Sequence, residues 1–252
     1  MKNSIEEKYN QGKNATEIFK GESELKALKE VYGETAGLFA GILKEKLEED
    51  TQYTLADLGA FKGELAQSIL KYIPELDLEV IAIDVNPDAL EQNKAADKKI
   101  TANLTELPLK DKSVDIAMMR YALQWNTLEK QEKIIEEVSR IIKKFAIIQH
   151  AGSENEDPQG WRGKVQRIFN DEELPELKRV EIFFSSRDEL EDRMKKMGVR
   201  FERVDEKVIE NLADVYCERY TLDAGKCERV RATLGDKNFM LRTTWVVFPK
   251  SE

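Results

Sequence analysis

A turn that contains two glycines lies between an apolar stretch and a helical pattern in the segment TLADLGAFKGELAQSIL, residues 54–70. A strand that ends at such a turn and continues into a helix presents backbone N–H groups to a ligand. Asp84 ends the next apolar stretch, 21 residues beyond Gly63. A carboxylate at that place can bind both hydroxyl groups of a ribose. These residues indicate a site for a ligand with a nucleoside part.

The turn does not fit the phosphate-binding motifs that use similar glycines. Counted from Gly59, the dinucleotide fingerprint requires glycines where this chain has Phe61 and Glu64. The Gly-Lys-Ser/Thr sequence of a nucleoside triphosphate loop does not follow the turn either. We therefore expect a ligand with an adenosine end and no phosphates.

The chain contains one histidine, His150. A single histidine excludes a multi-histidine metal site, and no Gly-x-Ser-x-Gly elbow is present to complete a hydrolase triad. His150 ends the apolar stretch KFAIIQH, so we expect it at the carboxyl edge of a sheet. There it is the candidate general base, with an expected pKa between about 6 and 8. The alternative is that His150 only hydrogen-bonds the backbone of the following segment or lies in solvent.

Short apolar stretches alternate with helical patterns between residues 51 and 150. Strands are expected at 53–59, 79–85, 100–102, 114–123 and 144–150, and helices at 63–73, 86–96 and 127–142. Asn86 and Thr127 are the expected N-caps of two of these helices. Such alternation predicts an α/β fold, a Rossmann-like doubly wound sheet that is mostly parallel.

The whole chain, residues 1–252, is interpreted as one domain that consists of four segments. Residues 1–50 form an N-terminal helical cap, with a break or kink expected at Gly33 and Gly37. Residues 51–150 are the cofactor-binding half, and residues 151–185 are a lid insertion after the fifth strand. Residues 186–252 supply a closing helix, with a capping box from Ser186 to Glu189, and two final strands.

Three segments in order resemble the S-adenosylmethionine-dependent methyltransferases of the Rossmann-like class, in their small-molecule branch. They are ADLGAFKGELA, VIAIDVNPDALEQN and ANLTELPLKDKSVDIAMMRYALQWN, and the resemblance covers about residues 35–150. Two departures are Phe61, where the family has a glycine, and KKF, where it has Pro-Gly-Gly. A bulky Phe61 is compatible with the turn if its φ is negative. The resemblance also implies that the last strand of the sheet is antiparallel.

The resemblance implies S-adenosylmethionine as cofactor and methyl transfer to an oxygen, nitrogen or carbon atom of a small molecule. The residues that it assigns to the cofactor are Asp57, Gly59, Gly63, Asp84, Val85, Asn103, Leu104 and Arg120. Those assigned to the substrate are Tyr121, Gln124, Trp125 and Trp161, although packing in the core or the lid is an alternative for both tryptophans. Asp84 has the alternative role of a helix cap.

Charge and cysteine content restrict partners and location. The chain has 40 Lys and Arg residues against 49 Asp and Glu, a net charge of −9, which argues against binding along a nucleic acid backbone. It has no apolar run long enough to span a membrane, and because its first residues contain no apolar h-region we expect that they are not a secretory signal. Cys217 and Cys227 are expected to be free thiols in a reducing cytoplasm. Two other functions remain open: a catalytically impaired scaffold that binds S-adenosylmethionine, and an RNA methyltransferase.

Overall fold

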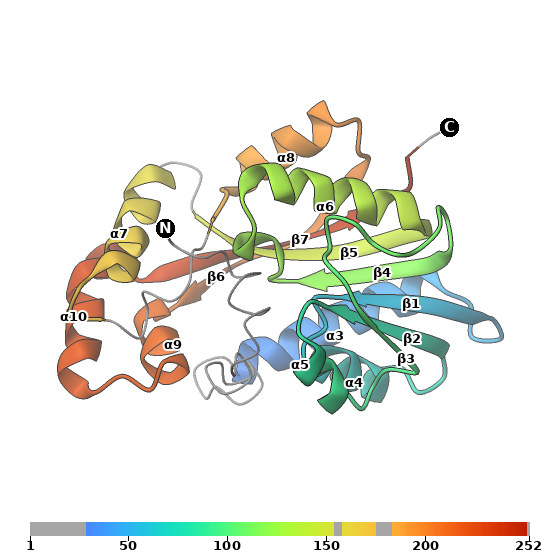
Figure 1. Cartoon of the computed structure of the whole chain (residues 1–252), viewed down its shortest axis with the longest axis horizontal. Helices are drawn as coiled ribbons and strands as arrows, with labels where there is room; N and C mark the ends of the chain where they lie inside the picture. The colour runs from blue at the N-terminus through green and yellow to red at the C-terminus, as the bar shows by residue number, and fades with distance from the viewer. Residues whose placement is uncertain (1–28, 154–157, 175–182, 251–252) are drawn as a thin grey trace.

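A seven-stranded sheet forms the centre of the molecule (Figure 1). The computed structural model describes residues 29–153, 158–174 and 183–250. The strands are β1 (Gln52–Leu58), β2 (Asp77–Asp84), β3 (Lys98–Thr101), β4 (Val114–Arg120), β5 (Ile142–Gly152), β6 (Phe201–Glu210) and β7 (Phe239–Val247). Their order is β3-β2-β1-β4-β5-β7-β6, and β7 runs antiparallel to both of its neighbours, β5 and β6, while the other neighbouring pairs are parallel. The expected Rossmann-like fold with an antiparallel final strand is confirmed.

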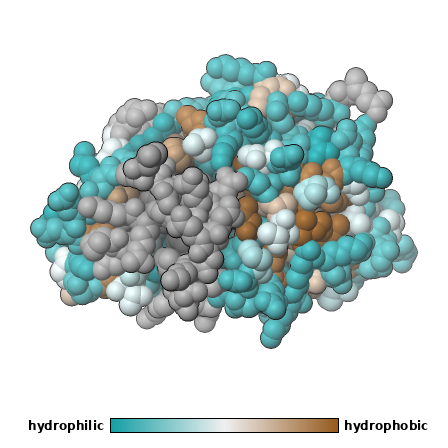
Figure 2. Space-filling model, in the orientation of Figure 1, coloured by the Kyte–Doolittle hydropathy of each residue, from teal (hydrophilic) through white to brown (hydrophobic). Residues whose placement is uncertain are grey.

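Helices cover both faces of this sheet. Alternate side chains of each strand point to opposite faces, so every central strand contributes to two cores. On one face α3 (Lys29–Lys46) and α4 (Glu64–Tyr72) pack through apolar side chains such as Phe39, Leu43 and Ile69. On the other face α6 (Leu128–Ile141) and α8 (Arg187–Lys196) contribute Ile134 and Leu190. The outer surface seen in Figure 2 is mainly hydrophilic, with apolar side chains gathered right of the centre of the view.

Local capping sets the starts of the helices as the sequence predicts. The Asn86 side chain accepts a hydrogen bond from the Ala89 N–H at the start of α5 (Pro87–Gln92), and Thr127 caps α6. Ser186 and Glu189 form the complete capping box of α8. These side chains satisfy N–H groups that have no partner within the first helical turn.

The expected break in the first described helix is wrong. Helix α3 runs without interruption through Gly33 and Gly37. Tyr32, Phe39 and Leu43 are buried on one side of it, and this packing offsets the helix cost of the two glycines, roughly 1 kcal/mol each. The predicted helix before residue 29 lies outside the described residues.

Two insertions join to form a cap at one end of the sheet. One is the segment after β5 with α7 (Pro158–Asn170), and the other joins β6 to β7 through α9 (Leu212–Arg219), α10 (Ala224–Leu234) and the turn η4 (Gly235–Lys237). The Phe169 ring of α7 packs edge-on against Tyr216 and Tyr220 of α9. The predicted lid at 151–185 therefore shares an apolar core with a second, later part of the chain.

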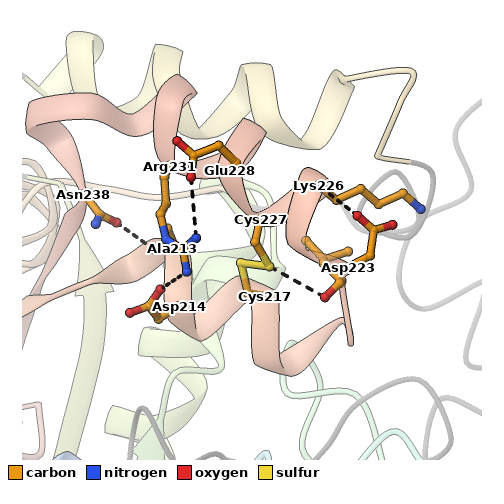
Figure 3. The surroundings of a disulfide bond; sticks show 10 residues. Ala213, Asp214, Cys217, Asp223, Lys226, Cys227, Glu228, Arg231 and Asn238 are labelled. Atoms are coloured by element: carbon orange, nitrogen blue, oxygen red, sulfur yellow. Dashed lines mark hydrogen bonds and ion pairs between the residues drawn. A yellow bond between two sulfur atoms is a disulfide. The ribbon is translucent and has the colours of Figure 1, made fainter.

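The two cysteines correct a prediction from the sequence. Cys217 of α9 and Cys227 of α10 are joined by a disulfide, with Cα atoms 5.5 Å apart (Figure 3). The expectation of two free thiols is wrong because the short turn between the helices brings their side chains together, and the argument for a reducing cytoplasm loses that basis. Among the described residues no helix has the length and apolar character needed to cross a membrane.

Candidate functional site

The turn after β1 has an unusual backbone at three positions. Gly59 and Gly63 have φ values of 72° and 78°, and Phe61 has a φ of 48°. The condition under which Phe61 was considered compatible with the turn, a negative φ, is therefore not met. The Gly59 and Ala60 N–H groups both donate to the Ile83 carbonyl, at 2.8 and 3.1 Å, and Phe61 is held by Asp84. These hydrogen bonds to the end of β2 keep the turn in the left-handed conformation that a phenylalanine rarely adopts.

Both glycines also lie too close to neighbouring groups for a side chain. A Cβ atom on Gly59 would lie 3.0 Å from the Cβ of Ala122 and 3.9 Å from the Cδ1 of Leu104. A Cβ atom on Gly63 would overlap the side chain of Asn93. Gly59 therefore marks the point where the turn meets the segments that follow β3 and β4.

Asp84 connects the turn to the start of α5. Its Oδ2 accepts a hydrogen bond from the Phe61 N–H and its Oδ1 accepts one from the Asn86 N–H, both at 2.9 Å. Burial raises the pKa of Asp84, while these backbone N–H groups favour its charged form. The helix cap itself is Asn86, so capping does not account for Asp84. The Val85 N–H also favours the charged form, and because a carboxylate can accept about four hydrogen bonds, acceptor capacity remains for a hydroxyl group.

Asp57 lies below the turn as a buried carboxyl group. Its exposed fraction is 4%, and its Oδ2 has no hydrogen-bond partner among the described residues. Burial is the main cause that raises its pKa to about 7, followed by the negative charges of Asp84 and Glu64. A buried carboxyl group without a cation is costly in its charged form, so this place favours a positively charged ligand group.

The segments after β2 and β3 supply the other predicted neighbours of an adenine. Val85 and Asn103 are half-buried, and Leu104 is buried against the turn. The Asn103 Oδ1 accepts a hydrogen bond from the Thr105 N–H at 3.0 Å, which fixes the start of the loop after β3. The structure therefore brings the predicted residues to one edge of the sheet, and their roles stay predictions.

Arg120, the last residue of β4, is held between aromatic rings. Its guanidinium carbon lies 5.2 Å from the ring centre of Tyr32 and 4.2 Å from that of Tyr121. Its Nε donates to the Oε1 of Gln149 at 3.0 Å. Stacking and this hydrogen bond orient the arginine at the carboxyl edge of the sheet.

Behind Arg120 lies a network of hydrogen-bonded polar side chains that the sequence patterns did not predict. Gln149 donates to the Thr244 hydroxyl at 3.0 Å, and the Thr35 hydroxyl accepts from Arg242 at 3.2 Å. Arg242, 3% exposed, also donates to Asp205 at 2.9 Å. The sequence does contain a signal for this network, because polar residues occur inside otherwise apolar stretches. Polar side chains that are buried in a strand need hydrogen-bond partners, so they are expected to pair with one another.

The predicted substrate residues divide between the site and the cap. Tyr121 is buried in the cap core with a φ of 52°, and its N–H donates to the Gln149 carbonyl. Gln124 and Trp125 form the short helix η3 (Leu123–Trp125), and the Gln124 carbonyl accepts from the Phe183 N–H at 2.7 Å. Trp161 is fully buried and its Nε1 donates to the Phe239 carbonyl, as lid packing predicts.

His150 differs from what the sequence predicts. It lies inside β5, which continues to Gly152, and its exposed fraction is 2%. Burial, with smaller effects from the positive charges of Arg193 and Arg162, lowers its pKa to about 3, so the expected pKa between 6 and 8 is wrong. The Ser185 carbonyl acts in the opposite direction, although neither ring nitrogen has a hydrogen bond of ordinary geometry to the described residues. This environment supports a neutral imidazole beside the backbone of the segment that follows the lid helix.

The described residues contain no group of three or more His, Cys, Asp or Glu side chains that could hold a metal ion.

Residues 56–148 match the family model described as a methyltransferase domain. The chain is 26% identical over 136 residues to an uncharacterized methyltransferase-like protein of Schizosaccharomyces pombe, an alignment that covers 53% of this chain. The aligned part spans 50% of that relative's length.

Solved structures show the same fold at low identity. The YcgJ protein from Bacillus subtilis has a TM-score of 0.63 at 16% identity, over 85% of this chain and 100% of that protein. Geranyl diphosphate C-methyltransferase from Streptomyces coelicolor, solved with geranyl diphosphate and S-adenosylhomocysteine, has a TM-score of 0.57 at 13% identity. That likeness covers 85% of this chain and 79% of the enzyme.

Proposed function

Residues 56–148 belong to the S-adenosylmethionine-dependent methyltransferases, and from this premise we propose that the protein transfers a methyl group to a small molecule. The observation that carries the proposal is the meeting of three segments at Gly59. A Cβ atom built on Gly59 would lie 3.0 Å from the Cβ of Ala122 after β4 and 3.9 Å from the Cδ1 of Leu104 after β3, so the turn after β1 lies beside both segments. A site built in this way lies where ligands of open α/β sheets bind.

The described residues fit the cofactor. The Asp84 carboxylate has acceptor capacity left for the ribose hydroxyl groups, and Val85, Asn103 and Leu104 lie next to it for the adenine. Gly59 and Gly63 supply the positive φ values of the turn, and their missing side chains let Ala122 and Asn93 pack against it. The turn lies at the carboxyl edge of the sheet, where the methionine part would bind. A cation placed near Asp57 would favour the charged form of this buried carboxyl group, which suits a ligand that carries an ammonium and a sulfonium group.

When bound, S-adenosylmethionine supplies a methyl group that is already electrophilic. The protein then has to align the acceptor with that methyl group and exclude water, which positioning achieves without covalent chemistry. Tyr121 and the residues of η3 are the described groups that follow β4 directly, and we assign them to the wall of the acceptor site. The neutral, buried His150 is poorly suited to accept a proton, so positioning by this wall is the mechanism that we favour.

A small acceptor is supported by charge and by the cap. The net charge of −9 disfavours a nucleic acid backbone, and the core shared by α7, α9 and α10 encloses the edge of the sheet near Tyr121. The solved geranyl diphosphate enzyme shows that this fold accommodates a small-molecule acceptor. We therefore propose an oxygen, nitrogen or carbon atom of a small molecule as the acceptor.

The test is binding of S-adenosylhomocysteine and S-adenosylmethionine, measured by calorimetry on the purified chain. We expect Asp84→Ala to weaken both by about 1.5–3 kcal/mol, the scale of a hydrogen bond to a charged group. The matched control is Asp88→Ala, because Asp88 is an exposed carboxylate in the first turn of α5. Unchanged affinity in a folded Asp84→Ala protein, or no binding to the unaltered chain, would contradict the proposal.

A further inference from the structure

A pocket lies between α7, the start of α6 and residues 183–184, apart from the predicted cofactor residues. It has a volume of about 380 Å³ and is lined by Leu128, Arg162, Val165, Phe169, Phe183 and Phe184, among others. None of the residues that we assign to the cofactor is part of this lining. Pockets of a few hundred Å³ with apolar walls and few polar groups are typical of small-molecule sites.

The walls of this pocket are fixed by hydrogen bonds and ring packing. The Phe183 N–H donates to the Gln124 carbonyl at 2.7 Å, and the Phe183 carbonyl accepts from the Gln131 side chain at 2.8 Å. The Phe184 ring packs edge-on against Trp161, with ring centres 4.8 Å apart. The aromatic side of the pocket is thereby tied to η3, α6 and α7.

The polar side of the pocket is formed by the guanidinium group of Arg162. Arg162 contacts Glu189, but Glu189 also accepts from the Ser186 N–H in the capping box of α8. The Arg162 Nε is buried and has no partner among the described residues. Burial, together with the positive charge of Arg193, lowers the pKa of Arg162.

Arg193 adds a second guanidinium that has neutral hydrogen-bond partners. It donates to the Gln131 Oε1 at 2.9 Å, to the Leu128 carbonyl at 3.2 Å and to the Ser185 hydroxyl. Leu128 is also part of the pocket lining, so Arg193 lies directly behind it. The negative charge of Glu132 acts on Arg193, and Glu189 pairs with Arg162. The Arg162 Nε nevertheless has no hydrogen-bond partner among the described residues, and a buried polar group of this kind favours a ligand that can accept from it.

We propose that this pocket binds a small carboxylic acid with an aromatic or branched apolar body. Its carboxylate pairs with Arg162, whose planar group can donate two parallel hydrogen bonds, and its body packs among Phe169, Phe183 and Phe184. Binding needs no methyl donor, so the inference does not rest on the proposed function. A failure of cofactor binding would leave it intact.

The probe for this site is 3-phenylpropanoate, titrated by calorimetry without cofactor and compared with its uncharged isostere 3-phenylpropanamide. We expect saturable binding of the acid and at least about tenfold weaker binding of the amide, as for loss of a charged hydrogen bond. This comparison uses the unaltered chain, so it does not depend on the folding of a variant. Absence of acid binding, or equal affinity for acid and amide, would overturn the proposal.

Two variants then locate the site. Arg162→Gln should weaken binding of 3-phenylpropanoate by about tenfold or more and abolish the preference over the amide. Arg167→Gln is the matched control, since Arg167 is an exposed arginine of the same helix outside the lining, and it should change affinity less than twofold, or about 0.4 kcal/mol. An equal loss in both variants would show a general charge effect and overturn the assignment to this pocket.

Discussion

At the scale of single residues, Asp57 makes the stability of the protein depend on pH. Its folded pKa of about 7 lies above the ordinary value of 3.8 because burial disfavours the charged form. Between these two pH values the folded state holds a proton that the unfolded state has lost. The contribution of Asp57 to stability is therefore complete below pH 4 and is lost as the pH rises to about 7.

Asp57→Asn should raise the free energy of unfolding of the cofactor-free protein at pH 8. The amide is neutral at every pH, so it avoids the cost of a buried charge, about 1.4 kcal/mol for each unit of pKa difference. Urea unfolding at pH 8 and pH 5 measures the change, which should be smaller at pH 5. Equal stability of variant and parent at pH 8 would show that Asp57 is not destabilising.

His150 has the opposite effect on the pH dependence of stability. Its folded pKa of about 3 lies below the ordinary value of 6.5, so between these values the unfolded state binds a proton that the folded state does not. Stability is lost as the pH falls from 6.5 towards 3, at about 1.4 kcal/mol for each pH unit. In His150→Asn this contribution should vanish, so urea unfolding at pH 7.5 and pH 5 should differ less than in the parent. The same pH dependence in both proteins would contradict the buried neutral histidine.

The residues of the site differ in how far the sequence could predict them. Asp84 and the glycine turn follow from spacing, because strand ends and turns are local features. The burial of His150 does not follow from spacing, because β5 continues two residues further, to Gly152, and the backbone of Ser185, distant in sequence, lies beside the imidazole. Phe61 could not be placed either, since its backbone depends on Asp84 from another strand.

At the scale of elements, replacing a glycine by alanine should have opposite effects on stability at Gly41 and Gly63. Gly41 lies in the interior of α3 with open space around it, so Gly41→Ala should stabilise the protein by about 0.5–1 kcal/mol through helix propensity. Gly63 precedes α4 with a φ of 78°, and a Cβ there would overlap Asn93, so Gly63→Ala should destabilise it. Thermal unfolding of the two variants tests both signs. Stabilisation by Gly63→Ala would mean that the turn can rearrange.

The elements that sequence patterns predicted are those with local signals. Asn86, Thr127 and Ser186 cap their helices because a side chain and an N–H group close in sequence suffice. Helices α9 and α10 were not predicted, because they are short and depend on packing against α7. The unbroken α3 has the same cause, since burial against the sheet outweighs the propensity of its glycines.

At the scale of the whole molecule, the sheet and the cap have separate apolar cores. The cap core includes Tyr121 at the end of β4 and Ala151 near the end of β5, so it meets the sheet at the edge where we place the methyl transfer. The cap is also assembled from two parts of the chain that are far apart in sequence. Its stability therefore controls how well the site is enclosed.

The disulfide between Cys217 and Cys227 lies within this cap and closes a loop that contains Arg219 and Lys226. Closing a loop of this length stabilises a protein by about 2–3 kcal/mol, mainly by restricting the unfolded chain. We expect reduction with dithiothreitol to increase the rate of trypsin cleavage within the loop, while the sheet resists cleavage.

Cys217→Ser is the matched control for this experiment. The variant should be cleaved quickly without reductant, and dithiothreitol should then have no further effect. Asp223, which caps α10 from inside the same loop, gives a second comparison, because Asp223→Ala weakens the helix start and leaves the disulfide in place. If thiol titration of the unfolded, unreduced protein finds two free thiols, the cap is held by the packing of Phe169, Tyr216 and Tyr220 instead. Trypsin cleavage of the parent would then be independent of reductant.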